Sequence, residues 1–365
     1  MDIPIELNVA NASQALLPVE LNVANAPQAL LPVELNVANA PQALLPVELD
    51  VANAPQALLP IELNVANASQ ALLPVELDVA NAPQALLPVE LYQLILTHSD
   101  FLTQIRLRCV NKMFRAKLEI HDFFNIDAYS NLLSDDILSS YPFITKLCVN
   151  RDSNITNLDH LTKLRMLYAP DCCAIDDICI SGLNLVKLYV DDNPYITNIN
   201  HMTKLEILGA GGMSGIADKT ISNLNLKKLY VGDNKNITNL NHMTNLKVLY
   251  ADGLFCGVED MHITNLNLRR LCCSNNLYIT NVNHMTNLEE LDAEDACGIG
   301  DNGICDLNLI KLNANWNPKI TTISHMTRLT ELHAIGDCGI ADAQIINLPL
   351  KKLISTENET ITKKI

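Results

Sequence analysis

Apolar and polar residues recur in a fixed order over the C-terminal two thirds of the chain. Each copy reads L-x-x-L-x-(V/A)-x-x-(N)-x-x-(I)-x-x-(L) and is 20 to 22 residues long, as in 226–245 and 246–267. Alternation over such short runs predicts strands with every second side chain inside. Ten copies lie between residues 144 and 349, with partial copies on both sides. We therefore expect one short strand in each copy.

This periodicity is the leucine-rich-repeat pattern. It implies an α/β-type solenoid, a horseshoe with a parallel β-sheet on its concave face and irregular or 3₁₀ turns behind. In alternate copies an Asn follows the strand, where its amide can pair backbone groups of adjacent coils that the turn would leave unpaired. These residues are Asn193, Asn234, Asn276 and Asn317, and the other copies offer Cys173, Cys256, Cys297 and Cys338 at about that place.

A different repeat, 14 residues long, fills residues 1–86. Most units hold two prolines, and each would cost roughly 3 kcal/mol inside a helix, which excludes a continuous helix. We expect a low-complexity array of single helical turns over stretches such as PVELNVAN, loosely packed or disordered. All positions of the unit are equally constant. This constancy favours recent tandem copying, tolerated as a spacer, over a functional acidic tether.

The charge of the chain, −16 in total, is unevenly distributed. Residues 1–86 contain nine acids and no Lys, Arg, aromatic residue or Cys, so all 25 basic residues lie in the remainder. This acidic balance argues against nucleic acid as a partner. No uncharged run approaches the roughly 18 residues of a membrane span, and MDIPIELNVA lacks the basic region of a signal peptide. We expect a cytoplasmic protein, with the nucleus as the alternative location, that has free thiols and no membrane partner.

The segment that follows the array, 87–118, reads LPVELYQLILTHSDFLTQIRLRCVNKMFRAKL. Its apolar spacing predicts three short helices, which are too few to form a large core without a partner or neighbour. The segment resembles the F-box, whose pattern is roughly L-P-x-E-L, then I-L, a short break, and L-x-x-x-R-x-V-(C/S)-x-x-(W/F). The matching residues are Leu87, Pro88, Glu90, Leu91, Ile95, Leu96, Leu102, Arg106, Val110, Lys112 and Phe114.

This resemblance implies that the segment docks on a Skp1-type adaptor and so joins a cullin-RING ubiquitin ligase. An F-box followed by leucine-rich repeats, here 119–365, is the layout of substrate receptors of SCF-type (Skp1-cullin-F-box) ligases. The repeats look like those of amoebae and large DNA viruses, which would place a viral member in the host cytoplasm. The alternative is a stand-alone leucine-rich interaction module with a vestigial F-box. The expected adaptor-binding residues are Leu87, Pro88, Leu91, Ile95, Val110 and Phe114.

No residue set in the sequence points to a catalytic, cofactor or metal site. We find no nucleophile–base pair, phosphate loop or HExxH motif. Histidines recur 41 or 42 residues apart at His160, His201, His242, His284 and His325. Adjacent coils are about 4.8 Å apart, so histidines two coils apart are about 10 Å apart, too far to share one zinc. We expect a non-catalytic protein without cofactor or metal, monomeric on its own, that binds a protein target.

The outward strand positions are the candidate target-binding site. Alternate copies have Lys or Arg at the third position, several have Tyr at the fifth, and acids flank them. Tyr, Trp and Arg are the usual energetic anchors of interfaces. The alternative is that repeat copying produced these stripes and that mixed charges only solvate the sheet. The predicted target-binding residues of the concave face are Lys187, Tyr189, Lys228, Tyr230, Tyr250, Arg270 and Trp316.

Overall fold

The computed structural model divides the chain into two compact units. The first comprises Met1–Ile155 with His160–Leu164, and the second comprises Thr156–Asp159 with Arg165–Ile365. The described residues are 5–10, 19–24, 33–38, 47–52, 61–66 and 75–80 as backbone, and 92–93, 96, 103–104, 108, 112–123, 133–149, 155–171 and 173–362.

The 14-residue repeats form strands, so the prediction of helical turns was wrong. The six strands are β1 (Ile5–Ala10), β2 (Val19–Ala24), β3 (Val33–Ala38), β4 (Val47–Ala52), β5 (Ile61–Ala66) and β6 (Val75–Ala80). Alternate units pair in parallel, giving the sheets β1-β3-β5 and β2-β4-β6. The stretch Val-Glu-Leu-Asn-Val-Ala alternates with period two and contains β-branched Val, which favours a strand over a helical turn.

The described part of the segment that resembles an F-box is helical. Its third helix, α3, is Lys112–Lys117, and helical residues also occur at 92–93, 96, 103–104 and 108. Leu96 and Phe114 are buried, and the Phe114 ring lies 4.5 Å from that of Tyr92. Phe114 therefore packs between helices. The other expected adaptor-binding residues, Leu87, Pro88, Leu91, Ile95 and Val110, lie outside the described residues.

A partial leucine-rich copy follows in the first unit, as the sequence predicts. Helix α4 (Asp135–Ser139) begins after Ser134, whose hydroxyl accepts a hydrogen bond from the Ile137 N–H at 3.4 Å. Strand β8 (Lys146–Cys148) then pairs in parallel with β7 (Asp122–Phe123). This order of short helix and strand is the same as in the later copies.

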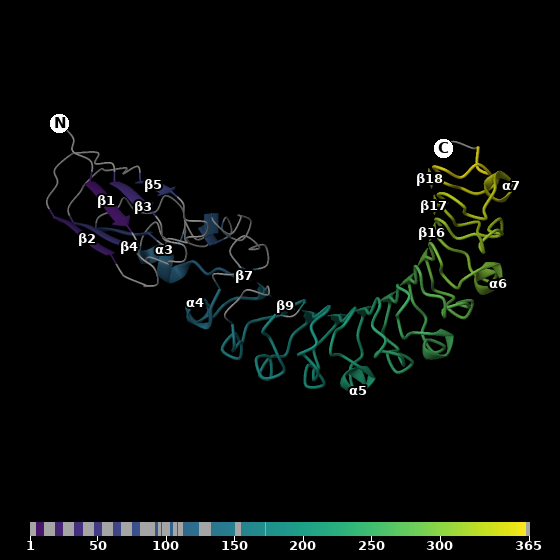
Figure 1. The fold of residues 1–365 in the computed structure, drawn as a ribbon, viewed down its shortest axis with the longest axis horizontal. Helices are drawn as coiled ribbons and strands as arrows, with labels where there is room; N and C mark the ends of the chain where they lie inside the picture. Colours follow the sequence, from purple (N-terminus) through teal and green to yellow (C-terminus); the bar gives the residue numbers. More distant parts are fainter. Residues whose placement is uncertain are drawn as a thin grey trace. The chain divides into compact units, whose positions relative to one another are not determined.

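The second unit is a parallel β-solenoid built from leucine-rich coils, which confirms the predicted fold class. Figure 1 shows its strands along the inner side of an arc and the short helices α5, α6 and α7 along the outer side. Each strand pairs in parallel with the next one in sequence. The ten strands are β9 (Met166–Tyr168), β10 (Lys187–Tyr189), β11 (Ile207–Gly209), β12 (Lys228–Tyr230), β13 (Val248–Tyr250), β14 (Arg270–Cys272), β15 (Glu290–Asp292), β16 (Lys311–Asn313), β17 (Glu331–His333) and β18 (Lys352–Ile354).

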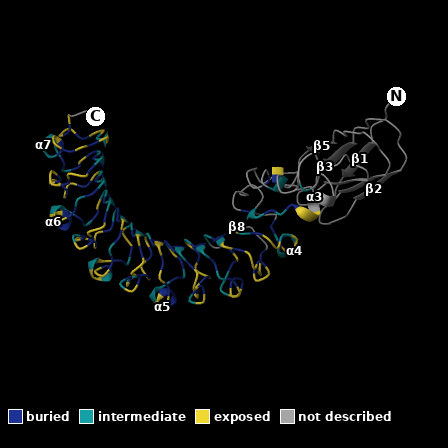
Figure 2. Ribbon diagram, turned by 180° about the vertical axis from the view of Figure 1, so that it is seen from behind, coloured by how far each residue is buried: buried dark blue, intermediate teal, exposed yellow. Residues whose placement is uncertain are grey.

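The core of this unit is a set of stacked apolar columns. In register, Leu188 lies between Leu167 and Leu208, and the same leucine column continues along the sheet. These leucines are fully buried. In Figure 2 the exposed residues of the unit lie mainly along the outer turns, while its interior is buried. Such a stack stabilises each coil through its two neighbours, as in other solenoids.

Buried asparagines connect the coils, as the sequence predicts. Asn234 is fully buried, and its amide donates to the carbonyls of Ala210 at 2.6 Å and Ile216 at 3.3 Å. Its Oδ1 accepts the N–H of Asn236 at 2.8 Å. Asn193, Asn276, Asn317 and Asn358 make the same set of bonds, to two carbonyls of the preceding coil and one N–H of their own coil. Each amide therefore satisfies backbone groups that face the apolar interior.

A second polar ladder, which the sequence analysis missed, runs along the outer side. The Asp218 carboxylate accepts the N–H and the hydroxyl of Thr238 in the next coil, at 2.7 and 2.5 Å. The acids Asp177, Asp260, Asp301 and Asp342 bind Thr197, Thr280, Thr321 and Thr362 in the same way. A visible signal was present, since every second copy has this Asp 20 residues before a Thr.

The outer side differs in part from the expected irregular or 3₁₀ turns. Alternate coils carry single turns of α-helix, and only one of these described elements is a 3₁₀ helix. They are α5 (Asp218–Ile221), η2 (Asp260–His262), α6 (Asp301–Ile304) and α7 (Asp342–Ile345). Each begins at an Asp of the ladder described above. A carboxylate at this place is stabilised by the partial positive charge at the N-terminal end of a helical turn.

We expect Asn234→Ala to destabilise the second unit by about 2 kcal/mol, because it removes three hydrogen bonds and leaves buried backbone groups unpaired. The denaturant midpoint, measured by circular dichroism, should fall. The matched control is Asn245→Ala, since Asn245 is exposed and should tolerate the change. Equal midpoints for the two variants would contradict the role assigned to the buried amides.

Candidate functional site

In each three-residue strand the central side chain points into the core, and the side chains before and after it point to solvent. In β10 the central Leu188 is buried, whereas Lys187 and Tyr189 are partly exposed on the inner, concave face. The predicted target-binding residues on β12, β13 and β14 occupy the corresponding places. Six of the seven predicted residues therefore lie on the concave face of neighbouring strands, and the seventh, Trp316, is described below. Whether they bind a target stays a prediction.

Four tyrosines, Tyr168, Tyr189, Tyr230 and Tyr250, form a continuous tyrosine ladder across β9 to β13. Ring centroids are 5.9 Å apart for the first pair, 6.2 Å for the second and 4.7 Å for the third. Strand β11 contributes Gly209 at this position, so the rings on either side meet across a strand without a side chain. A Cβ at Gly209 would lie 2.7 Å from the Tyr189 ring. The glycine is therefore required for the ladder to continue.

Arg270 completes the ladder at its C-terminal end. Its guanidinium carbon lies 5.2 Å from the centroid of the Tyr250 ring, a cation–π distance. The same guanidinium is 3.4 Å from the Glu290 carboxylate on the next strand. Burial among these groups raises the pKa of Tyr250, and burial likewise raises the pKa of Tyr189. Both phenols therefore stay neutral around pH 7.

The Lys and Arg residues at the third position of alternate strands form a cationic column across the sheet. This column is not equally positive along its length. In the C-terminal half Glu331 lies between two of its lysines, with Oε1 3.0 Å from Lys311 Nζ and 2.8 Å from Lys352 Nζ. His333 Nε2 is 2.9 Å from the same oxygen. In the N-terminal half, Lys187 and Lys228 have no carboxylate within ion-pair distance among the described residues. Positive charge is thus available mainly beside the tyrosine ladder.

Two aspartates flank the ladder where the strands end. The carboxylate of Asp191 accepts a hydrogen bond from the N–H of Gly211 at 2.7 Å. The carboxylate of Asp252 packs against Gly232, so closely that a Cβ added to this glycine would lie 2.9 Å from it. Both are half-buried. Burial raises the pKa of each carboxyl, and for Asp252 the nearby Asp233 and Asp292 add to the rise.

Trp316 lies at the turn edge of the sheet. It has a left-handed backbone with φ 55°, at the position where the other coils have Asp, Asn or Gly and the last one has Glu357. Asp, Asn and Gly tolerate this conformation better than Trp does. Its ring covers Gly336, where a Cβ would lie 2.4 Å from the indole, and it is 45% exposed. It lines an open hollow with Leu277, Pro318 and other turn residues. The structure therefore does not bring Trp316 into the tyrosine ladder.

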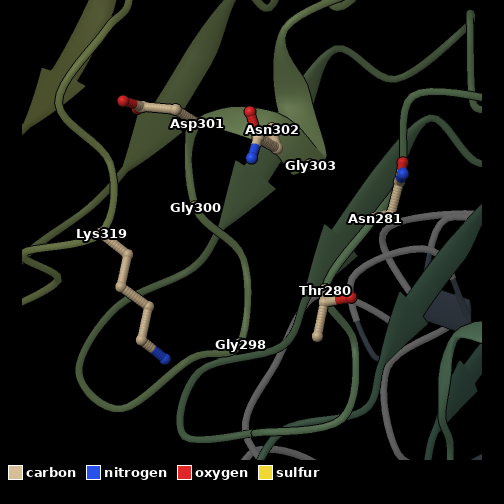
Figure 3. Close-up of a pocket in the computed structure, with 8 residues that line it drawn as sticks. All are labelled: Thr280, Asn281, Gly298, Gly300, Asp301, Asn302, Gly303 and Lys319. Carbon is tan, nitrogen blue, oxygen red and sulfur yellow. The ribbon is translucent and has the colours of Figure 1, made fainter.

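A second hollow lies between coils near α6 and is lined by small and polar groups (Figure 3). Its charged groups have structural partners. Asp301 binds Thr321 of the next coil, and Lys319 Nζ donates to the carbonyl of Cys297 at 2.9 Å. This arrangement explains packing between coils and offers no free acid–base pair.

The histidine column and the thiols have structural contacts. Nε2 of His201, His242, His284 and His325 lies 3.1 to 3.4 Å from a backbone carbonyl of the preceding coil. No cluster of potential metal ligands occurs in the described part of the chain. Eight of the nine described cysteines are buried, and all nine are free thiols. Burial raises the pKa of Cys256 to about 11, so this thiol is a poor nucleophile at neutral pH. Among the described helices, none has the length and apolar character to cross a membrane.

No protein-family model and no curated protein matches this chain. Similar solved structures include an internalin, InlF, from Listeria monocytogenes, 22% identical over 61% of this chain and 71% of that one, with a TM-score of 0.42. The functional domain of InlJ from the same organism, which includes a cysteine ladder, is 23% identical over 62% of this chain and 47% of its own, with a TM-score of 0.35. These similarities concern fold alone, so the assignment here rests on the repeat geometry itself.

We expect Glu331→Gln to lower stability by about 1 kcal/mol at pH 7, since it weakens a cluster of surface ion pairs. Hydrogen bonds from Lys352, Lys311 and His333 lower the pKa of the Glu331 carboxyl from 4.5 to about 2. A lowered pKa contributes stability that is present above the unfolded pKa and is lost as pH falls through the folded one. Urea midpoints of wild type and variant should therefore converge between pH 4.5 and 2.

The matched control for this experiment is Glu359→Gln. Glu359 is exposed and should change the midpoint little at any pH. A constant difference between wild type and Glu331→Gln across the whole acid range would show that the carboxylate is not held by these cations.

Proposed function

We propose that this protein is a non-catalytic interaction module whose solenoid binds a protein segment on its concave face. The observation that carries this proposal is the tyrosine ladder, completed by Arg270 over Tyr250. Its rings are half-buried and stack on one another instead of filling the core. Tyr rings bury a large contact area at a small entropy cost, and Tyr and Arg dominate the binding energy of many interfaces.

The surrounding charges support a peptide-like ligand. Lys187 and Lys228 lie on one side of the ladder and Asp191 and Asp252 on the other. A bound segment would therefore meet positive charge on one side and negative charge on the other. Such complementarity orients a partner and excludes wrong ones more than it adds affinity.

We further propose that residues 87–118 act as an F-box that recruits a Skp1-type adaptor and cullin complex in the cytoplasm. The support is the sequence pattern, together with the packing of Phe114 on Tyr92 and the burial of Leu96. The solenoid would then be the substrate receptor of an SCF-type ubiquitin ligase. The alternative, a stand-alone repeat module with a vestigial F-box, keeps the same concave site and lacks the adaptor.

Tyr189→Ala combined with Tyr230→Ala should weaken capture of a bound partner by roughly 2 kcal/mol or more for each true anchor. Partners are identified by affinity purification with mass spectrometry and then measured as purified proteins. Gly209→Ala is an independent variant, because it displaces the Tyr189 ring without removing it. Trp316→Ala tests the turn edge separately. If only Trp316→Ala reduces binding, the site lies at the edge and the concave assignment is wrong.

Pro88→Ala with Leu91→Ala should abolish pull-down of a purified Skp1-type adaptor, because both residues belong to the apolar pattern that resembles the F-box. Phe114→Ala is less suitable, since Phe114 is buried and its loss would disturb helix packing. Lys117→Ala is the matched control, because Lys117 is exposed on the same segment. Undiminished pull-down by the double variant, or none by the wild type, would favour the stand-alone module.

A further inference from the structure

Carboxylates on the concave side differ in how they are neutralised. Glu290 is paired with Arg270, and Glu331 with Lys311 and Lys352. Asp191 and Asp252 have no cationic partner within ion-pair distance among the described residues, although both are half-buried. A half-buried carboxylate without a cation is costly unless a ligand supplies one.

One cation of the chain, the Arg270 guanidinium, shows how a cation from a ligand would be held. Arg270 places its guanidinium on the Tyr250 ring and within 3.4 Å of the Glu290 carboxylate. A ring face and a carboxylate together favour a guanidinium, through cation–π attraction and a charge-assisted contact. Tyr189 with Asp191 repeats this combination of groups, and Asp252 places a second carboxylate beside the Tyr250 ring, whose faces are taken by Arg270 and Tyr230. In each pair the residues are two apart on the same coil, on the same face of the sheet.

We propose that the segment bound on the concave face is basic, and that it places one Arg or Lys against Tyr189 and Asp191 and a second against the Asp252 carboxylate, beside Tyr250. This inference rests on the proposed function of the concave face. It adds the chemistry of the partner, which the ladder alone does not specify. Lys187 and Lys228 then face acidic or polar residues of the segment on the other side of the ladder.

The strand order sets the spacing of the two cations in the partner. Strands β10 and β13 are three steps apart in the sheet, which corresponds to about 14 Å at about 4.8 Å per step. An extended segment that crosses the strands advances about 3.3 Å per residue. Side chains that point into a concave surface also converge slightly. The two basic residues are therefore expected about four positions apart, an even spacing that puts both side chains on the same face of the segment.

Single-stranded nucleic acid is the rival occupant, because bases stack on aromatic ladders in the same way. Its phosphates would approach Asp191, Asp252 and the exposed Asp192 and Asp233 at the strand ends. Two free lysines on the other side do not outweigh four carboxylates. Charge complementarity thus favours a basic protein segment.

The test uses the full chain and a displayed library of random peptides about twelve residues long, a length that spans the ladder. Enriched peptides are synthesised with a fluorescein label, and their Kd values are measured by fluorescence anisotropy. We expect enriched peptides to contain Arg or Lys pairs about four positions apart. Asp191→Asn with Asp252→Asn should weaken their binding about tenfold or more, as loss of charge-pair contacts does.

The variants are chosen so that folding and binding are separable. Asn keeps the acceptor that Asp191 offers to Gly211. Raised pKa values mean that these charged carboxylates cost stability above the folded pKa, so the double variant should melt no earlier than wild type. Asp337→Asn is the matched control, because Asp337 is an exposed acid distant in sequence from the ladder.

The outcomes distinguish this inference from the proposed function. Peptides that lose binding with Tyr189→Ala and Tyr230→Ala but not with the aspartate variant would overturn the basic-partner inference and keep the concave site. Peptides indifferent to both sets of changes, or no enrichment at all, would overturn both. Tighter, tyrosine-dependent binding of labelled oligothymidylate than of any peptide would overturn the inference in favour of nucleic acid.

Discussion

The structure of the second unit depends on pairing every buried backbone group of one coil with the next coil. A coil of 20 to 22 residues cannot satisfy its own carbonyls, because its three-residue strand covers only a short part of the turn. Each buried Asn closes this gap by bonding two carbonyls and one N–H. On the outer side, each Asp–Thr pair likewise connects adjacent coils, because the carboxylate accepts the N–H and the hydroxyl of a Thr in the next coil. With both edges fixed, the leucine columns stack in register.

That register decides what the concave face can present. Because every coil places its strand at the same height, side chains at one position form straight columns across the sheet. Tyrosines 21 residues apart thus come within stacking distance. A single glycine at β11 keeps the column continuous instead of interrupting it. Any binding surface of this protein is therefore a property of column positions, not of a local motif.

Electrostatics then divides the concave face into two halves. In the C-terminal half, Lys311, His333 and Lys352 form ion pairs with Glu331. These internal pairs leave little unpaired charge for a partner in that half. Beside the tyrosine ladder, two lysines and two half-buried aspartates have no such partner in the part of the chain that the structure describes. The same repeat unit therefore yields one half whose charges neutralise each other and one half with unpaired charge. At the third position, Ile207 lies between two lysines in the half beside the tyrosine ladder, where Glu331 does in the other half, so the half beside the ladder keeps its lysines unpaired.

The sequence by itself determined the solenoid, its strands, the leucine columns and the asparagine ladder, because each of these follows from spacing that repeats in every copy. It also placed the tyrosines on one face, since period two within a strand is a local property. It misassigned the 14-residue repeats, where the Pro at each unit start was compatible with a helical turn and the period-two pattern was the stronger signal. Only the tertiary structure showed that Trp316 covers Gly336 at the turn edge, that Tyr189 and Tyr230 meet across Gly209, and that Glu331 neutralises its lysines. Those contacts join residues of different coils, and their distances depend on rotamers and on coil-to-coil spacing, which no single repeat encodes.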